Sequence, residues 1–579
     1  MSSPETLSPA KISGTRQTGL APVVRSAVIS GLLLAAYVLA FSHHYDDALD
    51  TARRMTSGDV QAMFEFRHLI SRLIPFWLWR GLVAVGLHLQ ALTLLEITDF
   101  LSAVAAVMLM YRLLRQLEIS RGEAAGFTAA FGTSWAFWMY VGTGRPYSTS
   151  MFFALAACSV AVSMDAAPTE SSRLLRTAGA AALGMLSCLF WLQQFTSCIG
   201  VGMLVAMRPR SISLPRRTLY LAVYGFTGIV LSLAILLAGF TYTGVVHSTS
   251  DVHGWIASTH TAPVKFEGSS VMKAAFGHAA LLFPLHNLPY MVHGLLLHDP
   301  RLVAVGSLGW ELSKFTIAWL IFLPVYAYPL LAFRSATPER KALLACFFVP
   351  LAANLVFALL WLGSDQQRFL PSLTNVLVLA AMGFTAALEH FRDSRPARQR
   401  LMIGAIALLL FVAVTNLIDG VLRDQREFTH LAHEMEQARG AASDKDFIIF
   451  FGRDISVTYK TMVTYYLGPS YLDLGDEAFY HWERRDWSNQ LDSQIEPVLR
   501  RGGRVFVLDR LALGLNPVSA AWSEKQRPSP TTRDVALFLK TRFCVIPAWH
   551  IGADSYWQLT PRTAACKSPL DAPSNISKR

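Results

Sequence analysis

Long apolar blocks constrain this chain more than any other feature of its sequence. Many of these blocks approach the ~20 residues that an α-helix needs to cross a bilayer. They lack the alternation of apolar and polar positions that marks elements of soluble cores. Only 16% of the 579 residues are charged, whereas an average soluble protein carries roughly a quarter. The sequence therefore predicts a mainly α, polytopic membrane helix bundle.

Short basic segments between the apolar blocks set the expected topology, because cytoplasmic loops are rich in Lys and Arg. Placing every basic segment inside gives about 11 spans, with the N-terminus inside and the C-terminus outside. The net charge of +11 then resides in loops, so nucleic acid is not an expected partner. The spans are expected at 24–42, 91–112, 124–142, 148–165, 177–191, 193–207, 218–241, 315–334, 342–362, 370–390 and 401–420. The short pair over 177–207 is expected to turn near Trp191, Gln193 and Gln194.

Three parts of the chain follow from this topology. Residues 1–23 are polar and are predicted to be a disordered cytoplasmic N-terminus. Residues 24–420 form the membrane domain, with external loops at 43–90 and 242–314. Residues 421–579 form an extracytoplasmic soluble domain. The first apolar block is interpreted as a retained span because no cleavage site of the signal-peptide type follows it.

The soluble region has the pattern of an α/β domain. The short apolar runs 447–451 and 504–509, bounded by charged residues or Gly, are typical of buried strands. The runs 543–549 and 555–561 are expected to form a closing pair of strands, and 427–440 and 490–501 have helical composition.

Cysteine usage leaves one question open in this domain. Cys544 and Cys566 are the two cysteines outside the expected spans, and an oxidising exterior permits a disulfide between them. Two free thiols are the alternative.

A cluster of acids follows the first apolar block, in the segment HHYDDALDTARRMTSGD at 43–59. If this segment is helical, Asp46 and Asp50 share a face, and Arg53 and Arg54 follow them. Clustered carboxylates at a membrane boundary perturb each other's pKa, which is one way to make a general base. A solvated surface loop is the alternative interpretation.

Two further external segments carry candidate residues. Residues 64–82 are apolar, aromatic and basic, as in a helix that lies in the membrane interface, and Arg67 and His68 are its candidate binding residues. The loop 242–314 contains several histidines, of which His293 and His298 are the closest pair. Their spacing does not favour a metal site, and re-entrant amphipathic helices around 271–297 are expected instead.

These motifs together resemble the GT-C superfamily of membrane glycosyltransferases, which includes protein O-mannosyltransferases and aminoarabinose transferases. YDDALDTARRMTSGD is similar to the acidic motif after their first span, and RHLISRLIP to their His and Pro segment. SDQQRFLPSL (364–373) is similar to their Arg-aromatic-Leu-Pro motif at the outer end of a late span. GRPYSTSMFFAL (144–155) also fits. The acidic pair is Asp-Asp instead of Asp-Glu, and Pro-Pro after the His is missing, so the sugar and subfamily stay open.

The resemblance implies a sugar donor linked to polyprenyl phosphate and an inverting transfer to a hydroxyl on a lipid, glycan or protein acceptor. Asp47, or otherwise Asp46, is implied as the base, and Arg368 as the phosphate ligand. Arg145, Lys265, Arg67 and His68 are further candidates for substrate binding. No cofactor is expected, although a divalent cation stays open. The expected location is the plasma (inner) membrane.

Other functions are compatible with part of this pattern. A lipid-linked glycan flippase would need ionisable residues deep in the spans, and Glu96 and Asp99 lie near the outer end of theirs. A non-catalytic assembly or sensor protein would leave the acidic loop without a role. A protein similar to an O-antigen ligase or polymerase is chemically close to a transferase.

The topology can be tested with reporter fusions. A reporter that is active only outside the cytoplasmic membrane is expected to be active when fused after Arg579 and inactive when fused after Arg400. Activity after Arg400 together with inactivity after Arg579 would reject the orientation.

Overall fold

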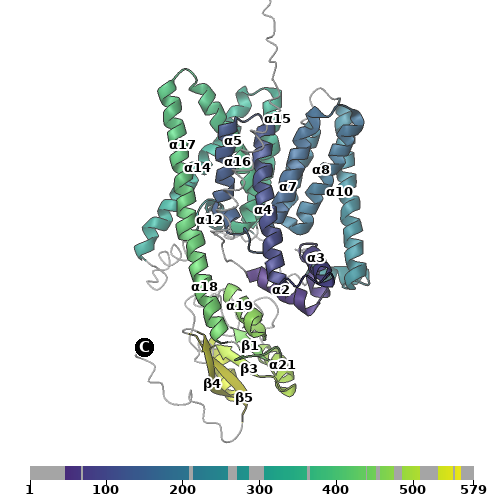
Figure 1. The fold of residues 1–579 in the computed structure, drawn as a ribbon, viewed down its shortest axis with the longest axis vertical. Coiled ribbons are helices and arrows are strands. Elements are labelled where there is room, and N and C mark those ends of the chain that lie inside the picture. The colour runs from purple at the N-terminus through teal and green to yellow at the C-terminus, as the bar shows by residue number, and fades with distance from the viewer. Residues whose placement is uncertain are drawn as a thin grey trace, which may run out of the picture. The chain divides into compact units, whose positions relative to one another are not determined.

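Apolar helices make up the larger part of the structure (Figure 1). The computed structural model describes residues 46–66, 69–207, 213–257, 266, 270–285, 305–360, 366–438, 440–450, 457–474, 486–508, 532–551 and 554–562. Within these residues, eight helical segments are long and apolar enough to cross a membrane. They are Ala91–Gln116, Tyr147–Ala166, Glu170–Phe190, Leu214–Thr243, Leu308–Ser335, Pro338–Leu360, Gln367–His390 and Arg395–Gln437.

The helical elements of the membrane part follow one another with short connections. They are α2 (Asp46–Ser57), η1 (Gln61–Met63), α3 (Leu73–Ala84), α4 (Ala91–Gln116), α5 (Arg121–Thr133), α6 (Trp135–Trp138), α7 (Tyr147–Val162), η2 (Ser163–Ala166), α8 (Glu170–Phe190), η3 (Leu192–Gln194), α9 (Phe195–Met207), α10 (Leu214–Thr243), α11 (Thr249–Ala257), α12 (Ser270–Ala279), α14 (Val305–Ser335), α15 (Pro338–Leu360), η5 (Gln366–Phe369), α16 (Leu370–His390), α17 (Arg395–Thr415) and the π-helical turn η6 (Asn416–Val421).

Most of the expected spans coincide with these helices. The predicted turn between 177–191 and 193–207 is confirmed, because α8 ends at Phe190 and η3 and α9 follow it directly. The expected span 401–420 continues through η6 into α18 (Leu422–Gln437) as one helical segment. The expected span 24–42 lies outside the described residues.

The expected span 124–142 is wrong as a single helix. Helix α5 ends at Thr133, and Ser134 adopts an extended conformation with ψ of 139°. The backbone N–H of Ala136 then donates to the carbonyl of Leu281 at 3.1 Å instead of continuing the helical ladder. The carbonyl of Leu281 therefore replaces the carbonyl that a continuous helix would offer to Ala136. Hydropathy alone does not reveal such a contact between distant segments.

The C-terminal region is an α/β domain built on a mixed five-stranded sheet of order β2-β1-β3-β5-β4. Strands β2, β1 and β3 are parallel, and β5 pairs antiparallel with both β3 and β4. The strands are β1 (Phe447–Phe450), β2 (Ser470–Asp473), β3 (Val505–Leu508), β4 (Phe543–Ile551) and β5 (Asp554–Pro561), and the helices are α18, α19 (Val457–Leu467), α21 (Trp487–Arg500) and α24 (Thr532–Arg542). The four predicted strands, two of which form the closing pair, are confirmed, whereas the sequence did not predict β2, α19 and α24.

Both faces of this sheet are buried, as alternate side chains of a strand point to opposite faces. Phe447 and Ile449 of β1 pack with α21 and α24 on one face. Ile448 and Phe450 pack with α18 and α19 on the other. The second core also contains Ala48 and Leu49 of α2, which come from the membrane part of the chain.

The cysteines divide between the two parts. Cys544 in β4 is disulfide-bonded, whereas Cys158, Cys188, Cys198 and Cys346 in the membrane helices are free thiols. The expected partner Cys566 lies outside the described residues.

Asp446 stabilises the start of the sheet. Its side chain accepts hydrogen bonds from the backbone N–H of Arg504 at 2.7 Å and of Ser443 at 2.8 Å, and from the Arg504 guanidinium at 2.7 Å. Burial alone would raise the pKa of Asp446, but these hydrogen bonds bring its pKa below the ordinary value. The carboxylate therefore links the residues that precede β1 and β3.

Replacing Asp446 with Asn is expected to destabilise the domain by ~1.5–3 kcal/mol, because hydrogen bonds to a charged group are lost. The melting temperature of the full chain in detergent should fall by roughly 5 °C at pH 7. The pKa of Asp446 is lower in the folded protein than in the unfolded chain. The wild type is therefore more stable than Asp446→Asn at pH values above the unfolded pKa of ~3.9. This difference in stability disappears as the pH falls through the folded pKa.

The matched control is Asp444→Asn, because Asp444 lies two residues before Asp446 and its side chain is exposed. It should leave the melting temperature unchanged. An equal fall for both variants would contradict the assigned role of Asp446.

Candidate functional site

The acidic segment that follows the first apolar block forms α2. Its Asp46 and Asp47, the predicted bases, are the first two residues of the helix. The side chains of both residues lie outside the described part of the structure, so the backbone fixes their place at the start of α2. The opposite, apolar side of α2 is at most 1% exposed and consists of Ala48, Leu49, Ala52 and Met55.

A network of ion pairs connects the rest of α2 to the following loop. Arg54 lies 2.7 Å from Asp50 and 2.8 Å from Glu65, and the buried Arg72 lies 2.8 Å from Glu65. Arg54 therefore pairs with Asp50 of its own helix and with Glu65 of the following loop. Asp50 is thus neutralised by a cation of its own helix.

The loop between α6 and α7 carries Arg145 to the start of α2. Its Gly144 has a φ of +77°, and a Cβ added there would lie 2.8 Å from Cβ of Leu95 and 3.3 Å from Cβ of Ala48. The loop is held by Asp99 of α4, which accepts the backbone N–H of Thr143 at 3.1 Å. Close packing thus places the residue before Arg145 against the first turn of α2.

Arg145 is enclosed by aromatic rings. Its side chain is 4% exposed. The guanidinium carbon lies 5.2 Å from the ring centre of Tyr140 and 5.6 Å from that of Tyr147. Cation–π contacts of this kind orient a guanidinium and keep its charge in a weakly hydrated place.

Arg368 is held in η5 by side chains from two other helical elements. Its carbonyl accepts hydrogen bonds from the amide of Gln193 at 2.5 Å and of Asn354 at 2.9 Å. Its guanidinium donates to the Gln193 side-chain oxygen at 3.4 Å. Arg368 is 8% exposed, so both its backbone and its charged group occupy fixed positions in the bundle.

Tyr147 joins the two arginine sites. Its hydroxyl donates to the side-chain oxygen of Gln367, the neighbour of Arg368. Its ring lies 4.7 Å from that of Tyr140 and 4.8 Å from that of Trp191. One connected set of contacts therefore runs from the first turn of α2 through the Arg145 loop to η5.

Sequence reasoning found part of this arrangement. Arg145 and Arg368 are brought into the connected set, whereas Arg67, His68 and Lys265 lie outside the described residues. Gln193 and Asp99 were noted as polar groups in or near spans without a role. The signal for Gln193 was a pair of glutamines inside an apolar stretch, and the structure makes it a support for Arg368.

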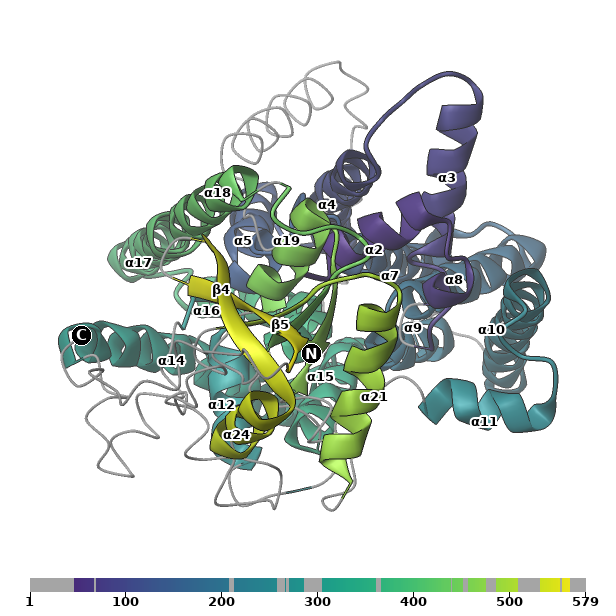
Figure 2. The same cartoon turned by 90° about the horizontal axis from the view of Figure 1, so that it is seen from below.

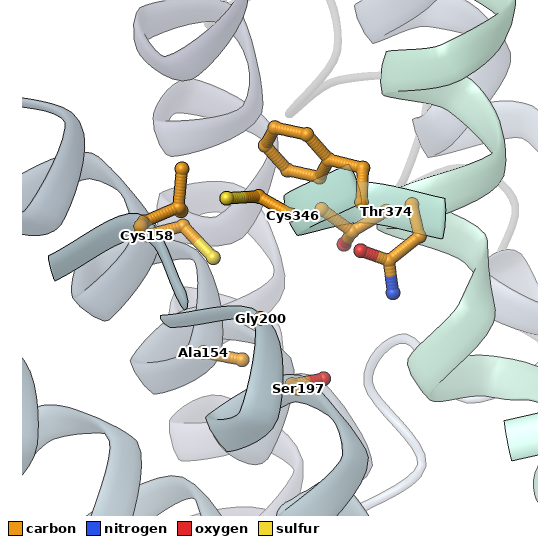
Figure 3. Close-up of a pocket in the computed structure, with 9 residues that line it drawn as sticks. Ala154, Cys158, Ser197, Gly200, Cys346 and Thr374 are labelled. Carbon is orange, nitrogen blue, oxygen red and sulfur yellow. The ribbon is translucent and has the colours of Figure 1, made fainter. Parts of the chain in front are cut away.

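A small cavity inside the bundle is a poor candidate for a substrate site. It holds about 10 Å³ between α7, α9, α15 and α16 (Figure 3), which is room for about one water molecule. Among the described residues, no group of three His, Cys, Asp or Glu side chains is assembled to hold a metal ion. His293 and His298 lie outside those residues.

Comparison with known proteins identifies the fold. No protein-family model and no curated protein sequence matches the chain. The structure of ArnT from Cupriavidus metallidurans in the apo state is similar, with a TM-score of 0.52 and 12% identity over 96% of this chain and 99% of that one. The Archaeoglobus fulgidus oligosaccharyltransferase in complex with Zn and sulfate has a TM-score of 0.51 and 12% identity over 92% of this chain and 72% of that one. The GT-C fold predicted from the motifs is therefore confirmed.

The close packing at Gly144 can be tested by adding one methyl group. Gly144→Ala is expected to lower stability by ~1–2 kcal/mol for the left-handed backbone and by a further ~1–3 kcal/mol for the clash with Leu95. Thermal unfolding in detergent measures the sum.

Gly86→Ala is the matched control, because Gly86 has a φ of +85° with no atom within 4 Å of an added Cβ. It should show the backbone cost alone. Equal effects of the two substitutions would mean that the Arg145 loop is not packed tightly against α2 and α4.

Proposed function

We propose that this protein is a membrane glycosyltransferase that moves a sugar from a polyprenyl-phosphate donor to a hydroxyl acceptor on the outer face of the membrane. The GT-C fold supports a transferase of this type. The observation that carries the proposal is the connected set of contacts between the start of α2 and the two buried arginines. These contacts link the Arg145 loop and η5 to α2, the helix that carries Asp46 and Asp47.

The proposed reaction is a single inverting displacement at the anomeric carbon. The acceptor oxygen attacks this carbon while its bond to the phosphate oxygen breaks, and the acceptor proton passes to Asp47, or otherwise to Asp46. A carboxylate that removes the proton during attack is an ordinary general base. No second acid is needed, because phosphate leaves without protonation, unlike the leaving group of glycoside hydrolysis.

The departing polyprenyl phosphate carries negative charge that must be neutralised. Arg368 is the first candidate because its position is fixed by Gln193 and Asn354. Arg145 is the second, since it is buried, follows the Gly144 that packs against Ala48, and lies against two tyrosine rings. Preorganised cations stabilise developing charge without reorganisation during the reaction. Arg67, His68 and Lys265 complete the proposed substrate ligands.

The acceptor is a lipid, glycan or protein hydroxyl, and the enzyme acts in the plasma (inner) membrane with its soluble domain outside. A divalent cation is compatible with this chemistry, so transfer should be measured with and without chelator. The flippase alternative differs in outcome, since it moves the lipid-linked sugar across the bilayer without breaking its bond to phosphate. A ligase or polymerase would transfer a glycan chain instead of one sugar.

Asp47→Asn and Asp46→Asn, made separately, test the base. One of them is expected to lower transfer ~10²–10⁴-fold, as loss of a general base does. Binding of undecaprenyl phosphate should be nearly unchanged, because a carboxylate does not attract phosphate. The measurements are transfer of radiolabelled sugar from synthetic undecaprenyl-phosphate sugars into acceptors of native membranes, and lipid binding to the purified protein.

Asp59→Asn is the matched control, because Asp59 is an exposed acid of the same loop and Asn preserves its acceptor bond to the Ala62 N–H. It should transfer normally. Near wild-type transfer by both Asp46 and Asp47 variants at equal abundance would remove the main support for the enzyme assignment.

A further inference from the structure

Helix α19 belongs to the soluble domain but packs against the proposed catalytic helix. Met462 and Val463 of α19 share one buried core with Ala48 and Leu49 of α2. All four side chains are at most 1% exposed. Figures 1 and 2 show α19 beside α2, at the end of the bundle where α4 begins. The position of α19 is therefore fixed relative to Asp46 and Asp47.

The last turn of α19 carries two adjacent tyrosines. The rings of Tyr465 and Tyr466 are 5.2 Å apart and perpendicular, with an interplanar angle of 85°. Both side chains are partly exposed. Tyr465 packs against the α19 core and also against the cluster that contains Ala52 of α2. The pair therefore lies between the soluble domain and the membrane part of the chain.

Glu96 of α4 acts electrostatically on this pair. Leu92 packs against the same two clusters as Tyr465, and Glu96 lies one helical turn after Leu92 on the same face of α4. Burial first, and then the Glu96 carboxylate, raise the pKa of Tyr465. For Tyr466, burial is again the largest cause, followed by Tyr465, Glu436 and Glu96. A tyrosine hydroxyl is protonated at neutral pH even at its ordinary pKa of ~10, so both phenols can donate hydrogen bonds.

This combination of groups matches the chemistry of a sugar ring. A pyranose or furanose has apolar C–H faces and a rim of hydroxyl groups. A partly exposed tyrosine ring offers an apolar face with a polar tip, and a carboxylate accepts hydrogen bonds from two hydroxyls. Ligand sites commonly combine aromatic walls with a few such polar groups.

We propose that Tyr465, Tyr466 and Glu96 form a subsite for the sugar ring that the donor carries on its lipid phosphate. This inference rests on the proposed function. It makes the soluble domain a part of the substrate site, because two of the three residues belong to α19. The donor then contacts both parts of the chain, with its phosphate at the arginines and its sugar between α19 and α4.

The test compares binding of two lipids, so it needs no acceptor. The probes are bare undecaprenyl phosphate and undecaprenyl phosphate carrying mannose, glucose, galactose, arabinose or 4-aminoarabinose, and the sugar that binds tightest is used. For Tyr465→Ala, Tyr466→Ala and Glu96→Gln, affinity for the sugar-linked lipid is expected to fall about tenfold each. Affinity for bare undecaprenyl phosphate should stay within a factor of two or so.

Two kinds of variant distinguish loss of sugar binding from loss of folding. Tyr465→Phe and Tyr466→Phe keep the ring and remove the hydroxyl, so they should retain the packing and lose part of the sugar preference. Tyr471→Ala is the matched control, because Tyr471 is a tyrosine on β2 of the same domain with 38% exposure. It should bind both lipids like the wild type.

The outcomes separate the subsite from the function. If the three variants keep the wild-type ratio of the two affinities, or if the wild type does not prefer any sugar-linked lipid, the subsite is wrong. The proposed function still stands in the first case if Asp47→Asn or Asp46→Asn abolishes transfer. A wild type that binds neither lipid and transfers no sugar would remove the proposed function itself.

Discussion

Burial of the apolar side of α2 is the interaction on which the rest of the structure depends. Leu49 lies in the core beneath the sheet, and Met55 lies in the cluster that packs against α3 and α4. Full burial of such a side chain contributes ~1.5–3 kcal/mol. One short helix thereby joins the soluble domain to the membrane bundle. The backbone at the start of this helix is consequently held by both parts.

The polar contacts of the outer bundle extend this arrangement. A buried polar group is costly unless it is hydrogen-bonded, and here each bond also fixes a candidate residue. Gln193 and Asn354 both donate to the carbonyl of Arg368, and Tyr147 donates to Gln367. The same contacts that satisfy the turns at the helix ends therefore orient the cations. Stability and the geometry of the site have a common origin in these turns.

Hydropathy and strand patterns predicted the parts of the chain whose structure is decided locally. The spans follow from composition, and β1 and β3 follow from apolar runs between charged residues. Long-range contacts decided the rest. The break at Ser134 depends on the carbonyl of Leu281, and α19 shows its importance only through its packing on α2. The motif resemblance identified Arg145 and Arg368, but the support from Gln193 and the contact between Ala48 and Gly144 need coordinates.

The buried charges of the membrane part have a structural role that differs from that of the site. Lys314 is fully buried, and its ammonium has three donors that meet three acceptors, namely Glu311, Asp419 and the carbonyl of Pro284. An ammonium whose donors are all used in this way is a closed ion-pair network, whereas a transport pathway needs ionisable groups that exchange partners.

The π-helical turn η6 connects this ion-pair network to the break at Ser134. Asn416 donates to the carbonyls of Thr133 and Leu282 at 2.7 Å each. A Cβ on Gly420 would lie 2.2 Å from the ring of Trp135, so only a glycine permits this approach. The irregular turn thus satisfies the backbone freed by the break at Ser134, and Asp419 within it completes the network around Lys314. These charges are paired with one another inside the bundle, whereas Arg368 and Arg145 are held by an amide oxygen and by tyrosine rings.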